Sequence, residues 1–232
     1  MIGFYDFTVI LTYLSLLSAS CGIIVSLSGH GHPYIGTFFL LFCGLCDAFD
    51  GKVARMKKER SRMECNFGIQ IDSLSDLVAF GVLPACIGSA MLRVSPLMEF
   101  VGEEWGEPCR KAIVAVLTAV LVLYILAALI RLAYFNVTEE ERQRTEGGAR
   151  KFYTGLPVTS AALIFPTILL LQYIIPTDVT PMYFAGVAFT GLAFLLKFQL
   201  KKPGLRGILI MVGIGAVEFI LMLLARMFQF RA

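Results

Sequence analysis

The chain has 232 residues, of which 57% are hydrophobic and only 16% are charged, and its mean hydropathy is +0.77. Soluble globular domains carry roughly 25% charged residues, so this composition excludes a soluble domain with an ordinary core. The net charge of +3 is small, and no internal repeat is visible. We therefore expect an all-α, polytopic bundle of membrane helices that forms one membrane-embedded domain over residues 1–232.

Seven apolar segments are candidate membrane spans, each of which needs about 20 apolar residues. The first is too long for a signal-peptide core and has neither a basic leader nor a small-residue cleavage site, so we expect a retained span. Glu218 lies within the last segment, and we expect it to be a structural carboxyl that faces the bundle. The segments cover residues 7–29, 34–57, 70–92, 112–135, 155–176, 181–198 and 206–228.

The basic residues are distributed unevenly between the two sides of such a bundle. The joints after the second, fourth and sixth segments hold 14 of the 20 Lys and Arg residues, whereas the other side holds five. Because cytoplasmic loops carry an excess of Lys and Arg, these joints and the N-terminus are predicted to be cytoplasmic. The acidic joint between residues 92 and 111 then lies on the opposite side.

Two groups of potential metal ligands have simpler interpretations. Cys43 and Cys46 directly precede Asp47, but one C-x2-C pair without a second is weak evidence for a metal or redox site. We expect these cysteines to pack at a helix interface. His30 and His32 stand in a Gly-Pro turn without a third partner, so we expect solvated turn residues there.

Four carboxylates inside or at the edge of apolar segments are the strongest functional signal. Asp47 and Asp50 are three residues apart, and Asp72 and Asp76 are four apart, so each pair shares one face of its helix. Two antiparallel helices joined by a short loop bring both pairs to a similar depth. A carboxylate in hydrocarbon costs several kcal/mol, so it is usually paired, bound to a metal or exposed to water.

The donor set favours a divalent cation that prefers oxygen ligands. A four-carboxylate cluster stays ionised only when cations neutralise it, and oxygen ligands favour Mg²⁺ or Mn²⁺ over zinc. Two such ions would suit a phosphoryl-type displacement. The alternatives are structural ion pairs with Lys52, Arg55 and Arg131, or a cation pathway through the membrane; the second predicts acidic residues spread through the bilayer depth.

The residues around the carboxylates are compatible with a phosphate substrate. Gly51, Ala54 and Gly68 remove side-chain bulk where a ligand must approach a helix backbone. Arg55 stands about one turn beyond Asp50, where its guanidinium can bind a phosphate through two hydrogen bonds.

The stretch from Asp47 to Asp76 reads D-x2-D-G-x2-A-R, a spacer, and then G-x3-D-x3-D. It resembles the signature of the CDP-alcohol phosphatidyltransferase family at eight fixed positions. The spacer of 12 residues is a few residues longer than is usual in the family, and a longer loop is tolerable because loop closure depends weakly on length. This leaves open which local contacts Arg60 and Arg62 make.

The resemblance implies a fold, an activity and a set of roles. It implies a six-helix core with additional helices, a homodimer, and two Mg²⁺ or Mn²⁺ ions on a diphosphate donor. The four aspartates Asp47, Asp50, Asp72 and Asp76 would be metal ligands, and Asp76 would also be the general base. The donor, CDP-diacylglycerol, would be contacted by Asp47, Gly51, Ala54, Arg55 and Gly68.

Three further stretches resemble the phosphatidylserine synthase branch of this family. They are the run that continues from Asp76 to Ala85, the sequence R-L-A-Y-F-N at 131–136, and F-Y-T-G-L-P-V-T-S-A-A at 152–162. In the second, Tyr134 replaces an arginine of the branch pattern, and in the first segment Ser18 replaces an asparagine. The candidate residues for binding the acceptor or a phosphate are Arg131, Asn136, Lys151 and Thr154.

The resemblance therefore predicts an enzyme of phospholipid biosynthesis in the lipid bilayer. It would transfer a phosphatidyl group from CDP-diacylglycerol to the hydroxyl of L-serine, which gives phosphatidylserine and CMP. Inositol phosphate, inositol, glycerol phosphate and choline remain as alternative acceptors, and a divalent-cation transporter remains as a non-enzyme alternative. We expect no nucleic-acid partner.

Overall fold

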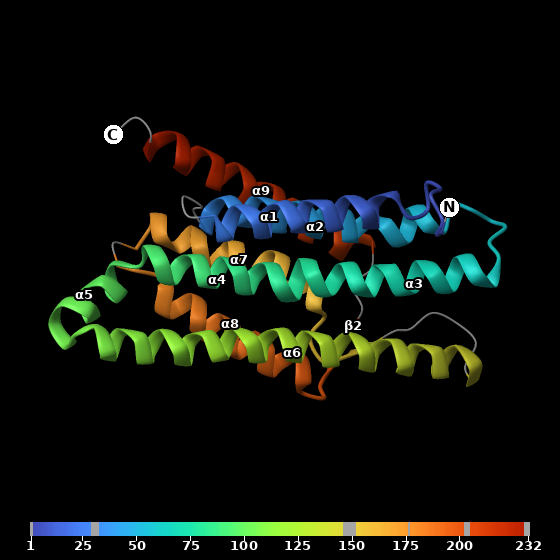
Figure 1. The fold of residues 1–232 in the computed structure, drawn as a ribbon. Helices are drawn as coiled ribbons and strands as arrows, with labels where there is room; N and C mark the ends of the chain where they lie inside the picture. Colours follow the sequence, from blue (N-terminus) through green and yellow to red (C-terminus); the bar gives the residue numbers. More distant parts are fainter. Residues whose placement is uncertain (1, 29–32, 146–151, 176, 202–204, 230–232) are drawn as a thin grey trace.

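In the computed structural model, the described part of the chain comprises residues 2–28, 33–145, 152–175, 177–201 and 205–229. This part is almost entirely helical (Figure 1), as the composition predicts. The α-helices are α1 (Ile10–Leu27), α2 (Pro33–Ala54), α3 (Arg62–Asp76), α4 (Leu83–Val94), α5 (Pro96–Trp105), α6 (Glu107–Thr145), α7 (Ala161–Leu170), α8 (Thr180–Leu195) and α9 (Leu205–Gln229). Two short strands, β1 (Phe152–Thr154) and β2 (Gln199–Lys201), pair antiparallel.

Five helical segments are long and apolar enough to cross a membrane, which confirms a polytopic membrane protein. They are Ile10–Leu27, Pro33–Ala54, Arg62–Val94, Glu107–Arg142 and Arg206–Leu224. The predicted spans 155–176 and 181–198 are shorter than expected, because the apolar helices there cover only Val158–Tyr173 and Thr180–Leu195. The helix of residues 107–145 is longer than the predicted span 112–135, so α6 continues beyond the apolar segment.

The two ends of the bundle differ in charge. The loop between α2 and α3 and the C-terminal end of α6 lie at one end of the molecule, and α5 lies at the other (Figure 1). The first end carries the basic residues of the loop between α2 and α3. The second carries Glu99, Glu103, Glu104 and Glu107. The helices thus separate basic and acidic joints as the sequence predicts.

The α3 and α4 helices form one continuous rod through a π-helical segment, Leu77–Val82, that begins directly after Asp76. Pro84 has no N–H to donate to the carbonyl of Phe80, four residues earlier. The hydroxyl of Tyr124 on α6 donates to that carbonyl instead, at 2.6 Å. The π-helical segment widens the helix beside Asp76, and such segments are frequent at functional sites.

The strand pair was not predicted from the sequence. Thr154 pairs with Gln199, and the N–H of Gly155 donates to the carbonyl of Phe198 at 2.7 Å. Gly155 has a φ of +76°, and a Cβ there would lie 3.0 Å from the carbonyl oxygen of Leu196. Only glycine therefore suits this turn, which ties the start of the α7 region to the end of α8.

The joint between α4 and α6 is also more ordered than expected, because it contains α5. Ser95 caps this helix by accepting a hydrogen bond from the N–H of Met98, and Pro96 occupies its first turn.

The main core lies where α6, α7 and α8 meet. It brings together the rings of Tyr124, Phe165, Tyr183 and Phe194, whose contacting pairs have centroids 5.0–5.7 Å apart.

Candidate active site

The α2 helix positions Asp47 and Asp50 through a close contact with α7. A Cβ at Gly44 would lie 2.6 Å from the Cβ of Ala162, so only glycine allows the two helices to approach this closely. Asp47 and Asp50 follow within the next two turns of α2. The carboxylate of Asp50 also accepts a hydrogen bond from the N–H of Gly51, which orients it near the helix end.

The α3 helix begins with a capping box that fixes its first turn. The hydroxyl of Ser61 accepts a hydrogen bond from the N–H of Glu64 at 3.1 Å, and the Glu64 carboxylate accepts one from the N–H of Ser61 at 2.7 Å. With this start, Gly68, Asp72 and Asp76 share one face of α3 at intervals of four residues.

An N-terminal contact holds the loop between the two halves of the motif. The ammonium of Lys57 lies 2.7 Å from the Asp6 carboxylate and 2.5 Å from that of Glu64. The hydrogen bonds that Lys57 and Thr8 donate lower the pKa of Asp6 from 3.8 to about 2. The ring of Phe4 also meets that of Phe67 edge-on, at 5.2 Å. The N-terminal segment therefore packs beside the loop and the start of α3.

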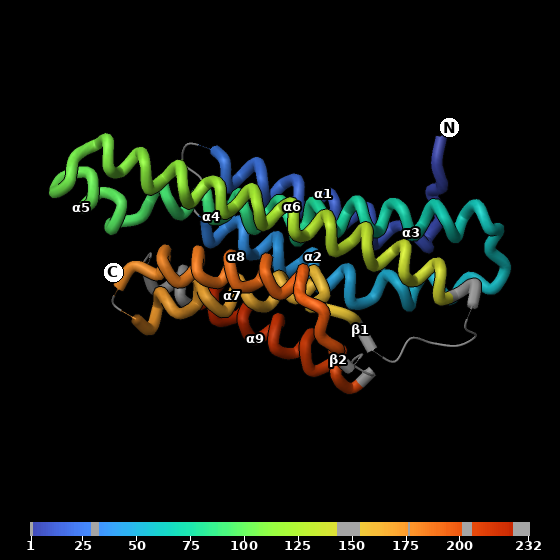
Figure 2. The backbone as a smooth tube through the Cα atoms, turned by 90° about the horizontal axis from the view of Figure 1, so that it is seen from below, coloured from blue at the N-terminus to red at the C-terminus, as the bar shows by residue number. Residues whose placement is uncertain are grey.

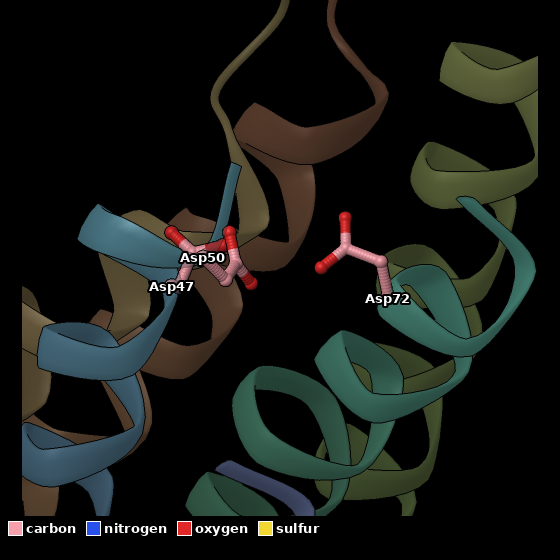
Figure 3. Close-up of side chains that lie close together, drawn as sticks. All are labelled: Asp47, Asp50 and Asp72. Carbon is pink, nitrogen blue, oxygen red and sulfur yellow. The ribbon is translucent and has the colours of Figure 1, made fainter. Parts of the chain in front are cut away.

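Asp47, Asp50 and Asp72 come together as a group that could hold a metal ion. Each offers one carboxylate oxygen, and these oxygens all lie within 4.8 Å of one another. Figure 3 shows Asp72 of α3 facing Asp47 and Asp50 of α2. Asp76 is one turn further along α3, is only 9% exposed, and is not part of this group of three. The structure thus joins the two halves of the motif in one acidic site, with Asp76 beside it.

The charge of the acidic group is not balanced by basic side chains. Among the described residues, the recorded ion pairs involve none of the four aspartates, which argues against the alternative of structural ion pairs. Two carboxylates whose oxygens lie within 4.8 Å of each other repel each other by at least roughly 3 kcal/mol at an effective dielectric constant of about 20. The half-buried oxygen donors therefore fit divalent Mg²⁺ or Mn²⁺.

The residues predicted to contact the donor lie around this group. The guanidinium of Arg55 covers Gly51, where a Cβ would be 3.5 Å from its nearest nitrogen. Ala54 is the last residue of α2. The guanidinium of Arg60 covers Gly68, where a Cβ would be 2.9 Å away, and it donates to the Glu64 carbonyl at 3.3 Å. The sequence left the contacts of Arg60 open, and the structure places them on the Asp72 face of α3.

The candidate acceptor residues have more varied positions. Arg131 is 6% exposed; its Nε donates to the carbonyl of Leu156 at 3.1 Å, and its guanidinium lies over the Phe135 ring. The amide of Asn136 donates to the hydroxyl of Ser73 at 2.7 Å, directly beside Asp72. Thr154 lies in β1. Lys151 lies outside the described residues.

The α2 side of the acidic site, with Asp47 and Asp50, borders a cavity of about 810 Å³. Asp47, Asp50, Lys52 and Arg55 line one part of it, and most of the other lining residues are apolar side chains of α2, α7 and α9. The contribution of α9 was missed by sequence reasoning, although the apolar residues of 208–220 recur at intervals of three and four.

Comparisons with known proteins agree with this site. A family model described as CDP-alcohol phosphatidyltransferase matches residues 7–196. The CDP-diacylglycerol–serine O-phosphatidyltransferase of Saccharomyces cerevisiae is 33% identical over 162 residues, which are 66% of this chain and 50% of that protein. The archaetidylserine synthase of Methanothermobacter thermautotrophicus is 34% identical over 153 residues, which are 65% of this chain and 53% of that protein.

A third relative, the CDP-diacylglycerol–serine O-phosphatidyltransferase of Helicobacter pylori, is 31% identical over 128 residues, which are 55% of this chain and 43% of that protein. The chain therefore spans about half the length of the curated relatives that it matches. The family model covers both halves of the aspartate motif and most of the bundle, from before α1 to the end of α8. By this match, the chain belongs to the CDP-alcohol phosphatidyltransferase family.

Proposed function

We propose that this protein transfers a phosphatidyl group from CDP-diacylglycerol to the hydroxyl of L-serine, which gives phosphatidylserine and CMP. The observation that carries the proposal is the meeting of Asp47, Asp50 and Asp72 from the two halves of the family motif. All three relatives are named as enzymes that form a serine phospholipid, which favours serine over the other acceptors. Residues 1–232 would form a single membrane-embedded domain.

The acidic site supplies the residues for this reaction. Asp47, Asp50, Asp72 and Asp76 would hold two Mg²⁺ or Mn²⁺ ions, which when bound neutralise the diphosphate and stabilise the departing CMP. Gly51, Ala54, Arg55 and Gly68 would bind the cytidine diphosphate part of the donor. This assignment is supported by Gly51 and Arg55, which both line the cavity, with the guanidinium of Arg55 over Gly51.

The chemical step would be a direct displacement at phosphorus. The serine oxygen attacks the phosphorus that carries diacylglycerol, the bond from that phosphorus to the CMP oxygen breaks, and Asp76 takes the hydroxyl proton. One displacement inverts the configuration at phosphorus. A stereochemical assay that finds retention would instead indicate a covalent phosphatidyl-enzyme.

The acceptor would bind on the α6 side of the site. Asn136 is the candidate that we favour, because its hydrogen bond to Ser73 holds it against α3 at the residue that follows Asp72. Arg131, Thr154 and Lys151 are proposed as further contacts to the serine carboxylate or to lipid phosphate. We also propose that the end of the bundle with the basic loops faces the cytoplasm, and that the protein is a homodimer.

The acceptor is tested by incubating the purified protein with CDP-diacylglycerol, Mn²⁺ and one acceptor at a time. CMP release is expected with L-serine and not with inositol, inositol phosphate, glycerol phosphate or choline. Release with inositol phosphate alone would overturn the serine assignment. Metal-dependent ion flux in liposomes without CMP release from any acceptor would overturn the enzyme proposal as a whole.

A further inference from the structure

The cavity beside the acidic site has two chemically different parts. Its polar part is lined by Asp47, Asp50, Lys52 and Arg55, and the remainder is lined mainly by apolar side chains. Its volume of about 810 Å³ lies within the range of roughly 300–1,000 Å³ that is typical of ligand sites. A ligand that fits both parts must join a charged head to an apolar tail.

One wall of this cavity is formed by a single stripe of α9. Its residues recur at intervals of three and four, so they occupy one face of the helix. The centre of the stripe carries the two smallest side chains, Gly215 and Ala216, with larger apolar residues on both sides. The stripe consists of Ile208, Met211, Val212, Gly215, Ala216, Phe219 and Ile220.

Side-chain contacts hold this wall against α2 and α7, beside which α9 lies (Figure 2). The ring of Phe219 meets that of Phe38 on α2 edge-on, with centroids 5.1 Å apart. Glu218, which is 6% exposed, shares a hydrogen bond with Thr167 on α7, so it is the bundle-facing carboxyl that the sequence predicts. Both contacts lie about one turn C-terminal to the small residues, where they hold α9 against α2 and α7.

We propose that α9 forms one wall of the binding site for an acyl chain of the lipid donor, and that Gly215 and Ala216 set the bulk of the chain that fits. The inference rests on the proposed function, because the occupant is the donor whose diphosphate lies at the aspartates. The continuity of the acidic and apolar parts in one cavity identifies this occupant. The α9 helix lies outside residues 7–196, which the family model matches.

The α9 wall selects the acyl chain by its shape and not through the hydrophobic effect. A lipid chain in the bilayer is already in apolar surroundings, so it gains little hydrophobic free energy by entering the cavity. Discrimination must then come from the fit of the chain between α2, α7 and α9. A Cβ at Gly215 would lie 3.5 Å from a methyl of Leu163 and 3.9 Å from one of Leu41, so one methyl group fits, whereas a longer side chain extends into the cavity.

The first test compares Gly215→Leu with Gly213→Leu. Gly213 is on the same helix, but no atom lies within 4 Å of a Cβ built there, so it controls for a leucine in α9 without filling the cavity. For each variant, kcat/KM is measured with dioleoyl and dihexanoyl forms of CDP-diacylglycerol. In Gly215→Leu the long-chain to short-chain ratio should fall about tenfold, because overpacking a fitted site is costly. In Gly213→Leu the ratio should match that of the wild type.

Equal ratios in the two variants would overturn the inference. If the wild type releases no CMP from either donor, the proposed function fails, and a binding experiment still tests the wall. In that experiment, a CDP-diacylglycerol with a diazirine at the end of one acyl chain is crosslinked to the wild-type protein. Crosslinks on the α9 stripe support the proposal, and crosslinks confined to other helices contradict it.

Discussion

The α2 and α9 helices line the same cavity, yet they do so in opposite ways. The α2 wall carries Asp47, Asp50, Lys52 and Arg55, whereas the lining residues of α9 are all apolar or glycine. On α2 the identity of individual atoms should matter, since the removal of one carboxylate oxygen would remove a proposed metal ligand. On α9 only the volume and shape of the side chains should matter, so substitutions between apolar residues of similar size should be tolerated there. The following variants test this contrast, beginning with those expected to change the reaction and ending with those expected to change only the stability of the fold.

The largest effect is expected at Asp76. Asp76→Asn keeps the size of the side chain but removes the base, so CMP release should fall about 10²- to 10⁴-fold. Binding of CDP-diacylglycerol, measured at equilibrium, should largely survive because Asp47, Asp50 and Asp72 remain. Asp178→Asn, at the opposite end of the bundle, is the matched control and should leave CMP release within about twofold. If Asp76→Asn keeps most of the activity, Asp76 is not the general base.

The next largest effect is expected on metal binding by the acidic group, which can be measured without an activity assay. Mn²⁺ at 100 times its dissociation constant should stabilise the wild-type protein by about 2.7 kcal/mol if only the folded state binds it. Asp72→Asn should remove most of this stabilisation, because it removes one of the three clustered carboxylates. Thermal unfolding in detergent with and without Mn²⁺ measures the difference. An undiminished stabilisation of Asp72→Asn would place the ion elsewhere, and Glu103→Gln controls for the loss of one charge.

A smaller effect is expected where α6 supports the π-helical segment after Asp76. Tyr124 is 2% exposed, and Tyr124→Phe removes the hydrogen bond to the Phe80 carbonyl, to which Pro84 cannot donate. An unsatisfied buried carbonyl should cost about 1–3 kcal/mol of stability, measured as a lower unfolding temperature. Tyr134→Phe on the same helix, at a position that is 45% exposed, should cost much less. Similar losses in both variants would count against a supporting role for this bond.

Sequence reasoning reached the features that depend on neighbours along the chain. The spacing of Asp72 and Asp76 predicts that both lie on one face of a helix. The short loop between the helices predicts that this face lies close to the face of α2 that carries Asp47 and Asp50. The sequence did not predict the bond from Tyr124 to Phe80 or the pairing of Thr154 with Gln199, because both join residues more than 40 positions apart.

Other misses had signals that were present but not used. The Ser95-Pro96 pair is typical of a helix start, and it could have predicted α5. The stripe of α9 was visible as a period of three and four, but that period alone does not distinguish a cavity wall from a surface that faces other helices or lipid. Only the packing of α9 against α2 and α7 shows that the small residues Gly215 and Ala216 line a cavity.

The smallest effect is expected at the N-terminal contact, in which Asp6 holds Lys57 of the α2–α3 loop. Because the pKa of Asp6 is about 2 in the folded protein and 3.8 without its partners, the contact stabilises the fold above about pH 4, and this contribution is lost as the pH falls toward 2. Asp6→Asn should therefore lower the unfolding temperature at neutral pH and lose this part of the pH dependence. The difference should be small, since the Asp6–Lys57 pair is solvent-accessible and therefore screened. The two unfolding curves should converge near pH 2, whereas a constant offset between them at every pH would show that Asp6 acts through packing rather than through its charge.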